Sequence, residues 1–143
     1  MNSSTHTYQL TAPKGRVFEF LSKIENLPKW ATLFCQELKR LEGDRYKVVT
    51  PQGEIFFRIE ADAKTGVIDM FGGPTEEHMA YWPARVVERG GGSLFIFTAY
   101  QYPGISDSEF VKQCEGLSQE FPRIAAHTSS LVGLAGGTDI GQS

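Results

Sequence analysis

A long amphipathic stretch near the C-terminus limits the folds that this chain can adopt. Its apolar residues follow one another at steps of four and three, namely Phe110, Cys114, Leu117, Phe121, Ile124, Thr128 and Leu131. This spacing predicts a helix of about six turns with one apolar face. The preceding segment, Ser106-Asp107-Ser108-Glu109, matches a capping box, so the helix is expected to begin at Ser106. A helix of this kind must bury its apolar face, and the rest of the chain has to supply the covering surface.

Residues 36–101 predict that surface, because apolar and polar residues alternate there and turn residues recur at short intervals. The pattern is typical of a meander of antiparallel strands, expected at 35–41, 45–50, 54–62, 66–71, 76–88 and 93–102. Gly72-Gly73-Pro74 and Gly90-Gly91-Gly92 suit tight turns between them. Pro83 cannot donate to a strand ladder, so a bulge or a sheet edge is expected there.

The N-terminal part predicts a strand at 5–11, a helix at 13–24 and a short helical segment that contains Trp30 and Phe34. The order of elements favours the α+β class, with about seven strands and two short helices after the first strand. A twisted sheet of that size curls, and a single helix in its concave face leaves room for a ligand. We expect one domain over residues 1–131 and a flexible, glycine-rich tail over 132–143.

Composition and charge exclude several other classes of protein. The net charge is −3 and the basic residues form no stripe, which argues against nucleic acid as a partner. An apolar run long enough to span a membrane and a signal peptide are both missing from the sequence, which favours a cytoplasmic protein. Cys35 and Cys114 lie far apart and match no metal-ligand spacing, and the three histidines are scattered. No metal or cofactor is therefore expected.

Three segments carry a resemblance to a known family: ENLPKWATLF, WPARVVE and FTAYQYPGISDSEF. Together they resemble the polyketide cyclase/dehydrase-like branch of the START and Bet v 1 superfamily, from about Thr5 to Leu131. The resemblance implies a helix-grip fold, in which the curved sheet wraps around the C-terminal helix and encloses a hydrophobic cavity. Members include lipid carriers, hormone receptors, ring-closing enzymes and chaperone activators. The family has no shared catalytic residue that could be transferred to a position here.

The first functional hypothesis is a protein that binds or transports a small hydrophobic molecule. The expected ligand-binding residues are Trp30, Phe57, Met70, His78, Phe97, Gln101, Cys114, Leu117 and Phe121. The alternative is an enzyme acting on an aromatic or polyketide-like substrate, with His78 as acid or base near Tyr81, Gln101 or Asp69. A third class, a regulator that binds proteins, would be favoured by a cavity filled with aromatic side chains.

Several of these residues also have an ordinary structural interpretation. His78 follows Glu76 and Glu77, as a solvated histidine at a rim would, and Asp69 alternates out of phase with its apolar neighbours. The strand 93–102 is apolar on both faces. The family resemblance implies that Phe95 and Phe97 face inward, which leaves Leu94, Ile96 and Tyr100 as an outward patch. We expect this patch to pack on the first helix or on a second subunit of a homodimer.

Overall fold

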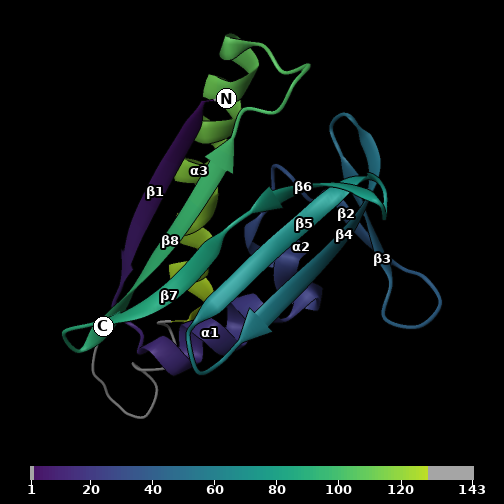
Figure 1. Cartoon of the computed structure of the whole chain (residues 1–143). Coiled ribbons are helices and arrows are strands. Elements are labelled where there is room, and N and C mark those ends of the chain that lie inside the picture. Colours follow the sequence, from purple (N-terminus) through teal and green to yellow (C-terminus); the bar gives the residue numbers. More distant parts are fainter. Residues whose placement is uncertain (1, 129–143) are drawn as a thin grey trace.

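The computed structural model describes residues 2–128, and Figure 1 shows how their helices and strands are arranged. Leu131 and the predicted tail at 132–143 lie outside the described residues. In chain order the elements are β1 (Ser3–Leu10), α1 (Lys14–Ser22), the 3-10 turn η1 (Ile24–Asn26), α2 (Leu27–Trp30), β2 (Glu37–Arg40), β3 (Tyr46–Thr50), β4 (Gly53–Asp62), β5 (Val67–Thr75), β6 (His78–Trp82), β7 (Ala84–Arg89), β8 (Gly92–Tyr100) and α3 (Asp107–Thr128).

The strands form one antiparallel sheet in the order β1-β8-β7-β5-β4-β3-β2, with β6 paired to β5 outside this path. The three helices lie on one side of the curved sheet (Figure 1), and α3 packs on α1, α2 and β1. The α+β class and the helix-grip arrangement predicted from the sequence are confirmed.

Side chains alternate between the two faces of the sheet, as the period of two predicts. In β8 the buried residues are Ser93, Phe95, Phe97 and Ala99, while Leu94, Ile96 and Tyr100 are less buried and lie on the outer face. In β5, Ile68 and Met70 are buried and Asp69 between them faces outward. The core therefore lies on the concave face of the sheet. Association of two subunits through the outer patch of Leu94, Ile96 and Tyr100 stays a prediction.

The sheet has eight strands because the expected strand 76–88 is divided at Pro83 into β6 and β7. β6 pairs with β5, whereas β7 continues beside β8. The turn predicted at Gly72-Gly73-Pro74 was wrong, since those residues lie inside β5 and the turn comes at 76–77. Position 73 requires glycine because a side chain there would collide with the backbone of His78 and Met79. At this point the register between β5 and β6 shifts.

The start of α3 agrees with the predicted capping box. The Ser106 N–H donates to Glu109 Oε1 at 3.0 Å, and the Glu109 N–H donates to Ser106 Oγ at 3.2 Å. The regular helix begins one residue later than expected, at Asp107, because Ser106 is the cap itself. The helix then continues through Pro122 to Thr128.

Candidate functional site

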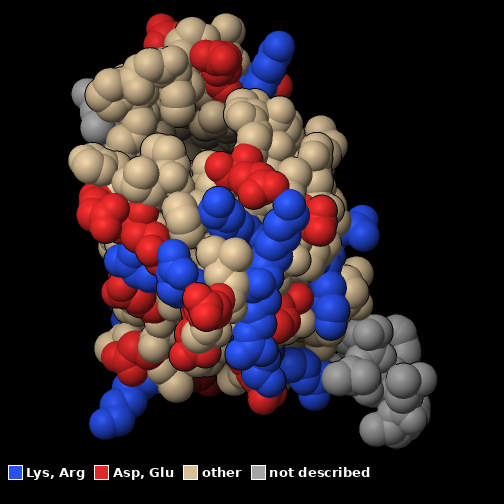
Figure 2. Space-filling view, turned by 90° about the vertical axis from the view of Figure 1, so that its right-hand side faces the viewer, with Lys and Arg blue, Asp and Glu red and all other residues tan. Residues whose placement is uncertain are grey.

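The apolar face of α3 is buried at both ends and partly open in the middle. Phe110 at one end and Phe121, Ile124 and Thr128 at the other are buried, whereas Cys114 and Leu117 on the same face are only half-buried. Residues between buried members of one helical face stay partly exposed when space remains in front of them. Seen from the right-hand side of Figure 1, the space-filling view shows a hollow in its upper part, bordered mainly by uncharged residues (Figure 2).

The other half of the concave face is filled by aromatic side chains. The ring of Phe121 lies within 6.2 Å, centroid to centroid, of the rings of Tyr8, Trp30, Phe95 and Phe97. All except Tyr8 are buried in the core. This cluster fixes the second half of α3 to the sheet and leaves the hollow to the first half.

A second aromatic cluster lies on β4, β6 and the segment after α2. Phe34 is 5.6 Å from Phe57 and 5.8 Å from Trp82 between ring centroids. Phe57 is buried, while Phe34 and Trp82 are half-buried. Gly72 of β5 provides the room for these rings, since a Cβ there would lie 3.0 Å from Phe57 and 3.2 Å from Trp82.

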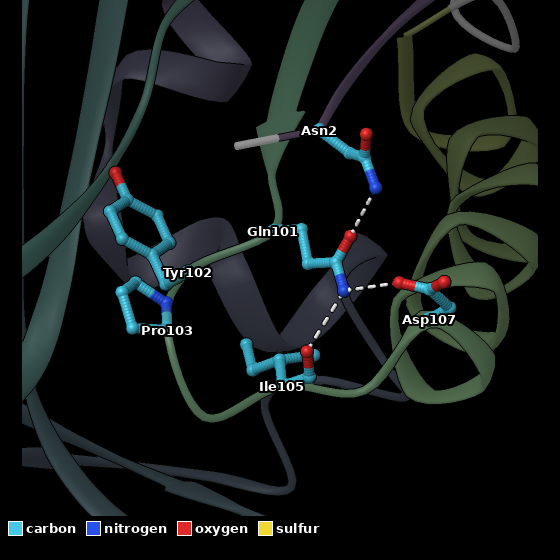
Figure 3. Close-up of a pocket in the computed structure, with 6 residues that line it drawn as sticks. All are labelled: Asn2, Gln101, Tyr102, Pro103, Ile105 and Asp107. Atoms are coloured by element: carbon cyan, nitrogen blue, oxygen red, sulfur yellow. Dashed lines mark hydrogen bonds between the residues drawn. The ribbon is translucent and has the colours of Figure 1, made fainter.

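A cleft of about 370 Å³ opens where the ends of β1 and β8 meet the start of α3. It is lined by Asn2, Gln101, Tyr102, Pro103, Ile105 and Asp107, and Figure 3 shows Gln101 held between its neighbours. Gln101 Nε2 donates to the Ile105 carbonyl at 2.9 Å and to Asp107 Oδ1 at 2.8 Å. Asn2 Nδ2 donates to Gln101 Oε1 at 2.6 Å. We call this cleft, lined by these six residues, the mouth.

Asn2 and Gln101 connect the mouth to the concave face. The Gln101 N–H donates to the Asn2 carbonyl at 2.8 Å, which adds one more step to the β1–β8 ladder. Because side chains alternate, Asn2 shares its face with Ser4 and His6, and Gln101 shares its face with Ala99 and Phe97. The mouth is therefore the open end of the concave face.

The predicted ligand-binding residues divide into three groups. Trp30, Phe57, Met70, Phe97 and Phe121 are buried in the packed core. Gln101 lies in the mouth, and Cys114 and Leu117 lie on the half-buried part of α3. His78 is exposed at the start of β6, where its Nδ1 is 3.1 Å from Thr75 Oγ1.

Of the four residues of the enzyme hypothesis, Tyr81 and Asp69 lie together, and His78 and Gln101 lie elsewhere. Tyr81 stacks on Phe71 at 5.0 Å on the outer face of the sheet, and Asp69 lies on that face too. Burial, and after it the Asp69 carboxylate, raises the pKa of Tyr81. Gln101 belongs to the mouth and His78 is exposed, so these four residues form no single constellation.

Three residues that the sequence analysis did not single out have unusual surroundings. Glu120 is 4% exposed, and its Oε2 accepts hydrogen bonds from the N–H groups of Leu33 and Phe34, both at 3.0 Å. Burial raises the pKa of this carboxyl, and the two N–H donors partly offset that rise. Its position between Leu117 and Ile124 at helical spacing could have indicated a carboxylate beside the buried face. The other two are Tyr102, whose hydroxyl is hydrogen-bonded to the backbone of Tyr81, and His6, whose Nε2 atom is buried.

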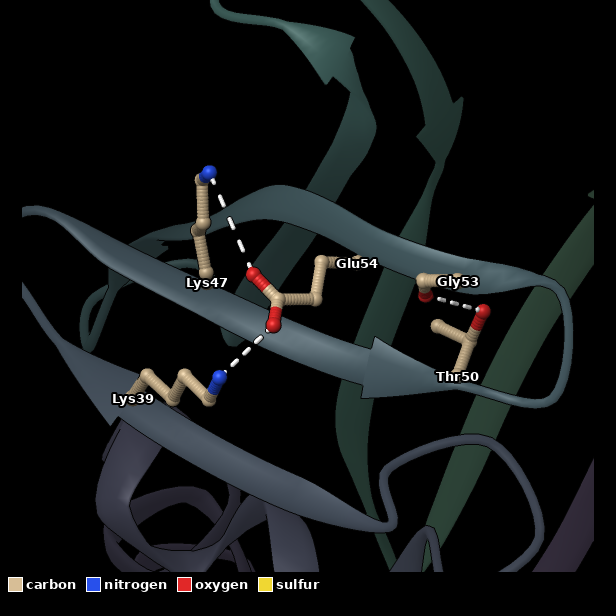
Figure 4. Close-up of polar contacts among 5 residues, drawn as sticks. All are labelled: Lys39, Lys47, Thr50, Gly53 and Glu54. Carbon is tan, nitrogen blue, oxygen red and sulfur yellow. Dashed lines mark hydrogen bonds and ion pairs between the residues drawn. The ribbon is translucent and has the colours of Figure 1, made fainter.

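The outer face of β2, β3 and β4 carries charged pairs instead of a site. Glu54 accepts from Lys39 Nζ at 2.6 Å and is 4.0 Å from Lys47 Nζ, as Figure 4 shows. These side chains are a third or more exposed, and such pairs contribute little to stability.

Among residues 2–128 no group of three His, Cys, Asp or Glu side chains is placed to hold a metal ion. No helix within that range is long and apolar enough to cross a membrane.

Comparison with known proteins identifies the fold and nothing narrower. Neither a protein-family model nor a curated protein matches the chain. Among solved structures, XoxI from Bacillus cereus is similar with a TM-score of 0.70 and 17% identity, over 92% of this chain and 98% of that one. Ara h 8.0201, a Bet v 1 homologue, is similar with a TM-score of 0.64 and 16% identity, over 90% and 98%.

Two further structures share the fold. The Aha1 dimer from Colwellia psychrerythraea is similar with a TM-score of 0.62 and 14% identity, over 92% of this chain and 96% of that one. DynU16, from the dynemicin biosynthetic locus, is similar with a TM-score of 0.67 and 12% identity, and this chain covers 48% of it. The chain thus has a Bet v 1-like fold, as its sequence resemblance predicted.

Proposed function

We propose that the protein binds a small hydrophobic molecule in the hollow between the first half of α3 and the concave face of the sheet. The observation that carries this proposal is the half-buried state of Cys114 and Leu117, which lie between buried residues of the same helical face. A helix packed on the sheet along its whole length would bury them as it buries Phe121 and Ile124.

The chemistry of the hollow favours an apolar ligand. Phe34, Trp82, Ile105 and Leu117 are partly buried apolar residues that pack against the core. Removing apolar surface from water contributes about 2.5 kcal/mol for each 100 Å². A molecule that covers these side chains is therefore held mainly by burial of its surface and theirs, with the polar groups of the mouth at its exposed end.

The alternative, an enzyme acting on an aromatic or polyketide-like substrate, has support only from the shared fold, which DynU16 also has. His78, the base in that hypothesis, is exposed and lies at the β5–β6 turn. A general base needs an oriented partner and a position within reach of the substrate. The surroundings of His78 favour the binding protein over the enzyme.

Two measurements test the proposal. Native mass spectrometry of gently purified protein should show an added mass that disappears when the protein is denatured. Protein freed of this molecule should bind the dye 1-anilinonaphthalene-8-sulfonate with increased fluorescence. Protein that carries no added mass and leaves the dye in a water-like state would contradict the proposal.

A further inference from the structure

The side chain of His6 is a polar group on the concave face that belongs neither to the aromatic clusters nor to the mouth. Along β1 the residues alternate between exposed and half-buried, and His6 is on the inner face together with Ser4 and Tyr8. Its partner across the β1–β8 ladder is Phe97, which is buried. His6 therefore points from the edge strand into the space that α3 covers.

Contacts on either side of His6 place it along α3. The side chain of Ser4 lies close enough to the Cys114 thiol to lower its pKa, which opposes the rise caused by burial, and the rings of Tyr8 and Phe121 lie 6.2 Å apart. Since His6 is halfway between Ser4 and Tyr8, it lies at the level of the helix between Cys114 and Phe121. That part of α3 contains Leu117, the half-buried residue of the hollow.

The Nε2 atom of His6 is buried and has no hydrogen-bond partner among the residues that the structure describes. Buried polar side-chain atoms are nearly always paired, and an unpaired one marks the place of a missing partner. Burial lowers the pKa of His6, which favours the neutral ring, and one nitrogen of a neutral ring can accept a hydrogen bond.

Small side chains separate the mouth from His6. The ladder pair at the mouth is Asn2 with Gln101, the next inner pair is Ser4 with Ala99, and the following one is His6 with Phe97. Ala99 leaves more space above β8 than Phe97 and Phe95, which follow it, while Ser4 beside Ala99 lies against Cys114 of α3. A ligand in the hollow can therefore extend from the mouth to His6, with Phe97 below it.

We propose that His6 is the polar anchor of the ligand site and selects an apolar molecule that carries a hydroxyl group at its inner end. A hydroxyl can either donate to Nε2 or accept from it, so it suits both neutral forms of the ring. This inference rests on the proposed function, because it requires a ligand in the hollow.

Displacement of the dye by two matched compounds tests the inference. 2-Naphthol should displace 1-anilinonaphthalene-8-sulfonate from the wild-type protein about tenfold more effectively than naphthalene, the effect of one hydrogen bond to a buried group. His6→Phe keeps an aromatic ring but removes the nitrogen, so it should retain naphthalene binding and lose the preference. His78→Phe alters an exposed histidine and should keep the preference.

The possible failures are distinguishable. If the wild type and His6→Phe each bind 2-naphthol and naphthalene with the same affinity, His6 is not the anchor, while the proposed function stands. If the wild type binds neither compound nor the dye, the proposed function is wrong and the anchor with it. Nitrogen-15 NMR of the wild-type His6 ring gives an independent check, because its Nε2 signal should shift on addition of 2-naphthol. A signal that saturating 2-naphthol leaves unchanged would overturn the inference. That is the result expected if Nε2 is paired to a resident water.

Discussion

The hydroxyl of Tyr102 is hydrogen-bonded to both backbone groups of Tyr81. It accepts from the Tyr81 N–H at 2.8 Å and donates to the Tyr81 carbonyl at 3.2 Å. After Pro83, β7 pairs with β8, but Tyr81 on β6 pairs with β5 on its other side. The single hydroxyl thus takes the place of a strand neighbour beside β6, and it belongs to a residue of the mouth.

Tyr102→Phe should loosen β6 next to the mouth. The variant loses two hydrogen bonds, which predicts a loss of about 1–2 kcal/mol in the free energy of unfolding. Hydrogen exchange of the Tyr81 amide should become faster, while amides in the β1–β8 ladder keep their rates. Tyr100→Phe, which removes a hydroxyl from the nearby strand β8, is the control. Unchanged exchange at Tyr81 would show that the hydroxyl does not hold this strand.

Glu120 predicts a pH-dependent contribution to stability. Because burial raises the pKa of its carboxyl, the folded protein holds this proton more tightly than the unfolded chain does. The stability contributed by Glu120 therefore falls as the pH rises above 4.5, the ordinary pKa of a glutamate, until the folded carboxyl has lost its proton. Glu120→Gln keeps an acceptor oxygen for Leu33 and Phe34 but removes the titration.

Urea unfolding of both proteins at a series of pH values measures this contribution. The free energy of unfolding of Glu120→Gln minus that of the wild type should increase as the pH rises from 4 to 7. Other carboxyls, which are the same in both proteins, cancel in this difference. A difference that stays constant or decreases over this range would contradict a raised pKa.

Gly72→Ala should destabilise the aromatic cluster of β4 and β6. Its added methyl group would lie 3.0 Å from Phe57, 3.1 Å from Ile55 and 3.2 Å from Trp82, so these side chains must move. Overpacking of this kind costs about 1–3 kcal/mol. Gly91→Ala is the matched control, since nothing lies within 4 Å of a Cβ there. Equal unfolding free energies for the two variants would show that the cluster is loosely packed.

The two cysteines should differ in their reaction with a thiol reagent. Burial, assisted by Glu120, raises the pKa of Cys35 to about 11, and burial also raises the pKa of the half-buried Cys114. Only the thiolate reacts, so at pH 8 Cys35 should react slowly and Cys114 faster. Saturation with 1-anilinonaphthalene-8-sulfonate should protect Cys114. Peptide mass spectrometry after timed labelling gives the labelling rate of each cysteine. A labelling rate of Cys114 that is the same with and without the dye would contradict an open hollow at Cys114.

The elements predicted well from the sequence depend on local signals. The capping box and the helical spacing from Phe110 onward involve neighbours in the chain, and the alternation in β5 separates the buried Ile68 and Met70 from the outward Asp69. Both faces of β8 are apolar, so its inward face was indicated by the family resemblance. The residues of the hollow could be predicted only in part. Leu117 and Cys114 were expected to face it, but no local pattern distinguishes them from the fully buried Phe121.

The rest depends on pairings between distant segments. The roles of Glu120 and Tyr102 arise from backbone groups of Leu33, Phe34 and Tyr81, which the sequence does not place beside them. The prediction of a turn at Gly72-Gly73-Pro74 was wrong for the same reason. Glycine is found where two strands approach closely, as Gly73 and β6 do, as well as in turns.

Filling the hollow from α3 should weaken binding of a ligand beneath the helix. Leu117→Trp places a larger ring in front of the sheet, whereas Val111→Trp changes a residue that is 53% exposed and serves as the control. Fluorescence titration with 1-anilinonaphthalene-8-sulfonate should give an affinity at least about tenfold weaker for Leu117→Trp, the effect of displacing ~60 Å² of apolar contact. The control and the wild type should bind alike. Equal affinity of all three proteins for the dye would contradict a ligand site beneath α3.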